Sequence, residues 1–139
     1  MQLVFESKWA SGRSAQINYT YEHPVDAHTG NTLHNVPAHL ANANLLIPLF
    51  SKKLTAGLDL HYASARRTLA GNKAQGFVLT NLTLSSNRFL GGFELSGSVY
   101  NLFDKWYGYL GGDEHREDII YQDGRTVRVK LTYTFGDDR

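Results

Sequence analysis

The clearest pattern in the chain is an alternation of apolar and polar residues near its C-terminal end. Between positions 126 and 135, every second residue from Val127 to Phe135 is apolar, and the residues between them are basic or carry a hydroxyl group. Successive side chains of a β-strand point to opposite faces, so this segment predicts a strand with one apolar and one polar face. A helix would scatter the same apolar residues around its circumference.

The same alternation recurs along the rest of the chain and predicts six further strands. Their apolar and polar faces can be assigned in five segments, and the opening segment follows the pattern least regularly. The predicted strands lie around residues 3–9, 14–22, 39–49, 54–64, 77–88 and 93–103. We therefore expect an all-β fold, an antiparallel up-and-down meander of about seven strands. The alternation alone fits both part of a transmembrane β-barrel and a soluble barrel or sandwich.

The connections between the predicted strands alternate in length. Tight connections lie around residues 11–13, 50–53 and 90–92, and long polar connections around residues 23–38, 65–76 and 104–123. Every second connection of an antiparallel meander lies at the same end of the sheet, so all tight turns share one end and all long connections share the other. This asymmetry is typical of an outer-membrane barrel, with short periplasmic turns and long extracellular loops.

A soluble barrel or sandwich would show the same alternation of residues. Two features favour a membrane barrel instead. Charged residues such as Asp59, Glu94 and Arg128 lie in mid-strand on the polar face, as a water-filled lumen would allow. Aromatic residues gather near the strand ends, as an interfacial girdle requires; they are Trp9, Tyr21, Tyr62, Tyr100, Trp106, Tyr107 and Phe135.

Composition excludes several classes of protein. Fourteen Lys and Arg residues against thirteen Asp and Glu leave a net charge of +1, which argues against nucleic acid as a partner. Charged residues make up 19% of the chain and aromatic residues 12%, unlike a disordered segment. The absence of cysteine excludes disulfides and thiolate chemistry. The first residues do not resemble a signal peptide, so we expect either a cytosolic protein or a piece of a longer one.

Three segments carry a resemblance to a known family. Residues 95–107, which include Asn-Leu-Phe-Asp-Lys-Trp-Tyr, resemble a signature near the C-terminal end of TonB-dependent outer-membrane receptors. Residues 122–135 resemble the final strand of these receptors, which closes on an aromatic residue, and residues 35–40 resemble the Pro-containing start of one of their strands. The resemblance covers essentially the whole chain, although residues 136–139 continue beyond the usual terminal aromatic residue.

The resemblance implies that residues 1–139 are the C-terminal segment of a receptor β-barrel, without the plug domain, the TonB box or the N-terminal barrel strands. An odd strand number agrees, because closed single-chain bacterial barrels have even numbers. The implied function is active uptake of a scarce nutrient, foremost a ferric siderophore, across the Gram-negative outer membrane. The implied partners are outer-membrane lipid, the TonB energy-coupling protein, the iron-siderophore and the barrel-assembly machinery. A small stand-alone outer-membrane pore or structural barrel, and a soluble ligand-binding β-barrel, are the alternatives.

Candidate ligand contacts lie in the two later long connections. Arg66 and Arg67 are candidates to attract an anionic siderophore or a lipopolysaccharide phosphate. Trp106, Tyr107 and Tyr109 are candidate stacking surfaces. His115 lies in the mixed acidic and basic run of the last long connection and completes the set. For each of these residues, an ordinary exposed loop side chain is the alternative interpretation.

No catalytic, cofactor or metal site is expected. The six histidines lack the spacing of metal ligands. His61 and Ser64 differ in parity along one predicted strand and so point to opposite faces, which argues against a hydrolase. The alternating end formed by Leu131, Tyr133 and Phe135 resembles the signal by which the barrel-assembly machinery recognises its clients.

Overall fold

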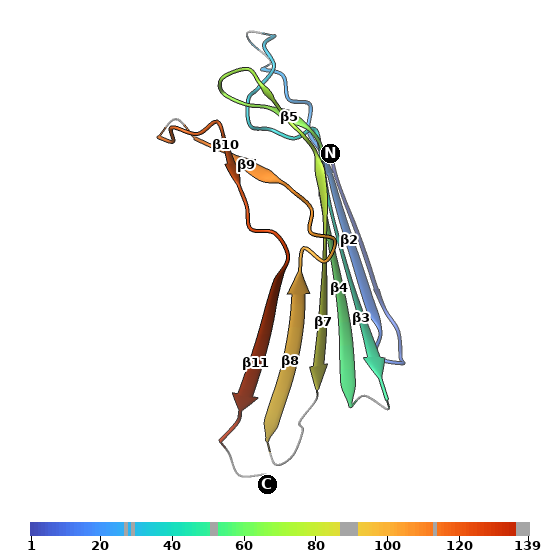
Figure 1. Cartoon of the computed structure of the whole chain (residues 1–139). Coiled ribbons are helices and arrows are strands. Elements are labelled where there is room, and N and C mark those ends of the chain that lie inside the picture. The colour runs from blue at the N-terminus through green and yellow to red at the C-terminus, as the bar shows by residue number, and fades with distance from the viewer. Residues whose placement is uncertain (27, 29, 51–52, 87–91, 113, 136–139) are drawn as a thin grey trace.

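The computed structural model describes residues 1–26, 28, 30–50, 53–86, 92–112 and 114–135. Seven strands form one antiparallel sheet in chain order (Figure 1). They are β1 (Gln2–Lys8), β2 (Ser14–Tyr21), β3 (His39–Leu49), β4 (Leu54–Ala63), β7 (Phe77–Ser86), β8 (Phe93–Tyr100) and β11 (Thr126–Tyr133). The all-β antiparallel meander predicted from the alternation is confirmed. Most of the predicted tight turn at 90–92, part of the one at 50–53, and residues 136–139 lie outside the described residues.

Two small hairpins accompany the main sheet. The connection from β4 to β7 contains β5 (Arg66–Arg67) paired with β6 (Lys73–Ala74), and the connection from β8 to β11 contains β9 (Gly108–Leu110) paired with β10 (Ile119–Tyr121). Figure 1 shows both hairpins at the same end of the sheet, together with the connection from β2 to β3. The long connections therefore share one end, as expected from their alternation with the tight turns. No helix long and apolar enough to cross a membrane occurs among the described residues.

Cross-strand register separates the sheet into two faces. One row across the apolar face pairs Phe5 with Ile17, Ile17 with Ala43 and Ala43 with Leu60. The apolar face has little cover from the rest of the protein, so that Val129 is 71% exposed. On the opposite face, polar side chains of neighbouring strands contact one another. For example, the hydroxyl groups of Thr83 and Ser98 are 2.9 Å apart.

The buried core is small and lies at the loop end of the polar face. It consists of Ala63, Phe77 and Leu79, with Leu40 and Tyr107 packed against them. Ala63 and Phe77 are register partners on β4 and β7, and Phe77 is only 4% exposed. The protein therefore buries apolar side chains mainly where the connections fold over the sheet, and not along the length of the strands.

Three expectations about strand ends need correction. Strand β8 ends at Tyr100 and not near residue 103, because Asn101 adopts a left-handed conformation with φ 51°. Strand β11 ends at Tyr133, so Phe135 lies beyond the ladder, where it is 87% exposed. Tyr100 does not belong to an apolar girdle: it lies on the polar face, where the Arg128 guanidinium is 5.3 Å from its ring centre.

Candidate functional site

The first two long connections are joined by hydrogen bonds. The backbone N–H of Asn35 donates to the carbonyl oxygen of Arg67 at 2.8 Å. His34 donates from Nδ1 to the carbonyl oxygen of Thr68 at 3.0 Å. Thr68 is fully buried, and its hydroxyl oxygen accepts the backbone N–H of Asn72 at 3.0 Å. Residues 34–35 and 67–72 thus form one folded unit, in which His34 has a structural partner and is not a free loop histidine.

The third long connection is tied to the second through Asp118. The side-chain amide of Asn72 donates to Oδ2 of Asp118 at 3.0 Å. This hydrogen bond, followed by one from Thr68, holds the pKa of the Asp118 carboxyl below its ordinary value. A further contact, from the side-chain amide of Asn35 to the carbonyl oxygen of Gly111 at 3.5 Å, links the first connection with the third. All three connections therefore form a single cap at one end of the sheet.

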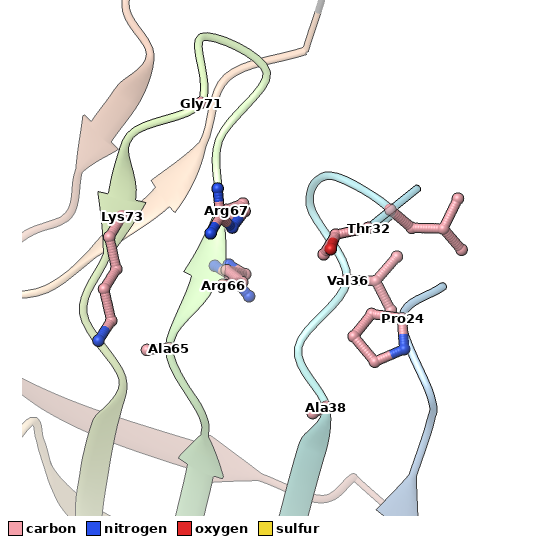
Figure 2. Close-up of a pocket in the computed structure, with 10 residues that line it drawn as sticks. Pro24, Thr32, Val36, Ala38, Ala65, Arg66, Arg67, Gly71 and Lys73 are labelled. Carbon is pink, nitrogen blue, oxygen red and sulfur yellow. The ribbon is translucent and has the colours of Figure 1, made fainter. Parts of the chain in front are cut away.

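A cavity of about 390 Å³ lies between the first and second connections. Figure 2 shows Arg66, Arg67 and Lys73 on the β5–β6 hairpin along one side, with the connection from β2 to β3 along the other. Within the described part of the chain, no carboxylate lies within ion-pair distance of any of these three cations, and no acidic residue lines the cavity. We call this cavity the cationic pocket; its lining residues are Pro24, Thr32, Leu33, Val36, Ala38, Ala65, Arg66, Arg67, Gly71 and Lys73.

Arg66 is the most constrained of the three cations. It is half-buried, and this burial lowers the pKa of its guanidinium from the ordinary value, against a smaller opposing effect of Tyr109. The guanidinium lies 5.9 Å from the ring centre of Tyr109, within cation–π range. A desolvated cation without a counter-ion is costly, so an anion that enters the cationic pocket would be stabilised there.

An aromatic cluster adjoins Arg66 on the polar face of the sheet. The ring of Phe77 lies 4.9 Å from that of Tyr107, 6.0 Å from that of Tyr109 and 5.8 Å from that of His61. Burial raises the pKa of the Tyr107 phenol, with smaller contributions from Tyr109 and Asp123. Tyr107 therefore packs inward, which corrects its placement in an interfacial girdle.

The structure brings together some of the candidate ligand contacts and separates others. Arg66, Arg67 and Tyr109 lie around or beside the cationic pocket, with Tyr107 next to Tyr109. Trp106 lies in a different cavity, where its ring is 4.9 Å from that of Tyr121. His115 lines a third cavity, of about 270 Å³, together with residues 69–70. The six residues therefore do not form one site.

Sequence reasoning missed Lys73 as a member of the cationic pocket. Lys73 is the register partner of Arg67 in the β5–β6 hairpin. The signal that could have indicated this pairing is Gly71-Asn72, a turn-forming pair between two short basic segments. Phe77, around which the aromatic cluster packs, was assigned to a strand and not to a site.

The Asn-Leu-Phe-Asp-Lys motif forms a tight turn after β8. Oδ1 of Asn101 accepts the backbone N–H of Lys105 at 2.7 Å, and its Nδ2 donates to the carbonyl oxygen of Lys105 at 2.9 Å. Asp104 Oδ1 accepts the backbone N–H of Arg125 at 2.7 Å, which joins this turn to the start of β11. The polar residues of the motif thus bind backbone groups and hold the turn in place; we call residues 101–105 the Asn101 turn.

The other sequence-based candidates have clear positions. His61 contacts the side chain of Asn42 on the polar face, whereas the Ser64 hydroxyl accepts the backbone N–H of His39 at 3.0 Å. Leu131 and Tyr133 lie on the apolar face of β11, and the rings of Tyr133 and Phe135 are 4.5 Å apart. Within the described part of the chain, no group of three His, Cys, Asp or Glu side chains is placed to hold a metal ion.

Comparison with known proteins adds a structural likeness. Neither a protein-family model nor a curated protein sequence matches the chain. A solved structure of a variant of the ferric enterobactin receptor of Pseudomonas aeruginosa matches 96% of this chain with a TM-score of 0.76 and 19% sequence identity. Another variant of this receptor, in complex with enterobactin, matches 95% of the chain with a TM-score of 0.72 and 20% identity.

The chain has the fold of a segment of a receptor β-barrel. It spans 22% of the length of the enterobactin receptor in both structures. At this level of identity the likeness concerns the fold alone: the seven-stranded sheet matches part of the β-barrel of a transport receptor.

Proposed function

We propose that this chain is the C-terminal segment of the β-barrel of a TonB-dependent outer-membrane receptor that imports a ferric siderophore. The correspondence of nearly the whole chain with part of a ferric enterobactin receptor carries this proposal. Two features support it: the exposed apolar face, which suits contact with outer-membrane lipid, and the clustering of the long connections at one end. In the proposed receptor, the long connections lie outside the cell.

The cationic pocket is the proposed ligand contact of this segment. Arg66 and Arg67 provide planar guanidinium donors, which suit the oxygen-rich anionic groups of a ferric siderophore. Tyr109 supports Arg66 from beside the pocket. Trp106 and His115 lie in other cavities, so we assign the ligand contact to the two arginines and Tyr109.

Iron uptake by cells tests the transport proposal. Deletion of the gene for the protein that contains this chain should abolish uptake of radioactive iron from at least one ferric siderophore, and an uncoupler of the proton gradient or loss of TonB should have the same effect on the wild type. Uptake that persists without the gene, for every ferric siderophore supplied under iron limitation, would refute a receptor role.

Charge-neutralising variants test the ligand contact. Replacing both Arg66 and Arg67 by Gln should raise the KM for uptake about tenfold or more, because each charge-assisted hydrogen bond contributes about 1.5–3 kcal/mol. The maximum rate should stay the same, since the arginines contact the ligand and not the coupling machinery. Lys53→Gln removes one positive charge from an exposed side chain at the tight-turn end and is the control. An unchanged KM would remove the arginines from the ligand site.

Immunoblotting of native outer membranes tests the proposed domain organisation. An antibody against residues 123–135 should detect a protein several times larger than 139 residues. A heat-modifiable membrane band of 139 residues would indicate a stand-alone barrel instead. A band of this size in the soluble fraction would indicate a soluble ligand-binding β-barrel.

A further inference from the structure

A second cavity with unpaired cations lies near the boundary between the apolar face and the cap. Its volume is about 410 Å³, and it lies between the residues that lead into β7 and the β9–β10 hairpin. Lys73 and Lys105 line it together with three aromatic side chains, and none of the described residues around it is acidic. Its full lining is Lys73, Ala74, Gln75, Gly76, Lys105, Trp106, Tyr107, Gly108, Ile119 and Tyr121.

Lys105 connects this cavity with the apolar face of the sheet. The same lysine lines an adjoining cavity of about 370 Å³ together with Phe103, Tyr62 and Val78. Tyr62 and Val78 are register partners that belong to the apolar face. A ligand held at Lys105 would therefore lie where the apolar face ends and the polar connections begin.

Large aromatic side chains mark the same boundary. Phe103 is 75% exposed and Trp106 is 72% exposed, although both are large enough to favour burial. The ring centre of Trp106 lies 4.9 Å from that of Tyr121. The outer surface of this aromatic pair is exposed. Exposed aromatic residues at the end of an apolar strand surface are typical of the membrane–water interface.

The two lysines lack counter-ions within the described part of the chain. Neither has a carboxylate within ion-pair distance there. Asp104, the sequence neighbour of Lys105, uses its Oδ1 to accept the backbone N–H of Arg125. The Asn101 turn fixes the backbone of Lys105 through both its N–H and its carbonyl oxygen. Hydrogen bonds thus fix the backbone of Lys105, whereas its ammonium group has no counter-ion among the described residues.

We propose that this cavity binds the phosphate-bearing headgroup of an outer-leaflet lipid, with Lys73 and Lys105 as the phosphate-binding residues. The proposal rests on the membrane orientation given under the proposed function. Continuity with the apolar face favours a lipid over a soluble anion, because the acyl chains of a bound lipid would cover Tyr62, Val78 and Phe103. Long lysine side chains at this depth extend toward the headgroups, where anionic lipids attract them.

Lipid binding to the intact purified protein tests this site. Native mass spectrometry would compare the affinity for lipid A, which carries two phosphates, with that for dephosphorylated lipid A. Lys105→Gln should weaken lipid A binding about fivefold, because a basic residue near an anionic membrane surface contributes about 1 kcal/mol. Binding of the dephosphorylated lipid should not change, and Lys105→Arg should retain wild-type binding.

Controls separate this site from its neighbours. Lys105 does not line the cationic pocket, so Lys105→Gln should leave the KM for siderophore uptake unchanged. Lys53→Gln, at the tight-turn end of the sheet, should leave lipid A binding unchanged. Equal affinity of the wild type and Lys105→Gln for lipid A would overturn the proposal, as would displacement of lipid A by inorganic phosphate at an equal concentration.

Flotation with phosphatidylcholine vesicles distinguishes failure of the lipid site from failure of the membrane orientation. Protein that floats with vesicles but does not select phosphate would overturn the headgroup site alone. Protein that does not associate with vesicles would overturn the membrane location and the headgroup site together.

Discussion

At the scale of single residues, Asn101 shows how a recognisable motif can act through the backbone. It is 5% exposed, adopts φ 51°, and hydrogen-bonds both backbone polar groups of Lys105. Asn tolerates the left-handed conformation better than most residues because its short polar side chain bonds locally. Its own N–H donates to Oδ1 of Asn81 on β7 at 2.9 Å, so the turn is also anchored to the sheet.

Substitution of Asn101 separates its hydrogen bonds from its backbone conformation. Asn101→Gly should lower the free energy of unfolding by about 2 kcal/mol, since two hydrogen bonds of about 1 kcal/mol each are lost. Asn101→Ala should cost about 1 kcal/mol more, because alanine resists the left-handed conformation. Urea denaturation of the intact protein in lipid vesicles would measure both values. Equal and negligible effects would contradict the role of the turn.

Asp118 should give the cap a pH dependence at low pH. Because its folded-state pKa lies below the ordinary value, its stabilising contribution is complete above the ordinary carboxyl pKa and is lost as the pH falls through the lower, folded-state pKa. The side-chain amide resonance of Asn72 should therefore shift in an NMR titration from about pH 7 to about pH 3. Asp118→Asn should show a constant resonance position, and a titration that persists in this variant would assign the effect to another group.

At the scale of elements, the two hairpins in the cap are the features that the residue pattern did not reveal. Strands of two or three residues, such as β5 and β9, are too short to display a period of two. Hydrogen bonds with neighbouring connections stabilise them. The backbone N–H of Asn35 donates to the carbonyl oxygen of Arg67, and the carboxylate of Asp118 accepts from the side-chain amide of Asn72. In contrast, the strands of 7 to 11 residues in the main sheet carry a clear alternation and were predicted within a few residues of their ends.

Substitution of Gly76, between β6 and β7, tests how closely this segment approaches the end of β4. A Cβ atom at Gly76 would lie 2.7 Å from the carbonyl oxygen of Ala63 and 2.8 Å from the backbone nitrogen of Ala65. Gly76→Ala should thus lower the free energy of unfolding by about 1–3 kcal/mol, because the backbone must move apart. Gly97 in β8 is the matched control, since a Cβ there would meet no atom within 4 Å. Comparable destabilisation by Gly97→Ala would show that the close approach is not the cause.

At the scale of the whole molecule, the sheet has two edges and one uncovered face. Strand β1 and strand β11 are the outermost strands of the seven-stranded sheet. Edge strands present unpaired backbone donors and acceptors, which favour pairing with another chain. The apolar face adds exposed side chains such as Phe5 and Leu131, at 59% and 65% exposure. In the proposed receptor, other barrel strands would pair with the two edges, and lipid would cover the apolar face.

The 139-residue chain produced by itself should therefore associate. In detergent, the micelle covers the apolar face but leaves the edges of β1 and β11 unpaired, so light scattering should detect oligomers and not a uniform monomer. The intact protein in the same detergent is the control and should remain of uniform size. A monodisperse, water-soluble monomer of the isolated chain would contradict both the edge argument and the assignment of the apolar face to lipid.

The sequence by itself determined the seven strands, their two faces and the end of the sheet that carries the long connections. These are local properties, because alternation depends on neighbouring residues and connection length on spacing along the chain. The resemblance carried by residues 101–107 also agreed with the fold found by structural comparison. The structural role of these residues, in contrast, became visible only from the hydrogen bonds of Asn101 and Asp104.

Only the tertiary structure decided which loop residues share a cavity. Arg66 and Arg67 were candidates from the sequence, but Lys73 joined them through hairpin register, and residues 24, 32–33 and 36 completed the cationic pocket from another connection. Tyr107 and Trp106 are adjacent in sequence, yet one packs on Phe77 and the other pairs with Tyr121. The physical reason is that the position of an irregular connection depends on contacts with segments far away in the chain, which no local pattern records.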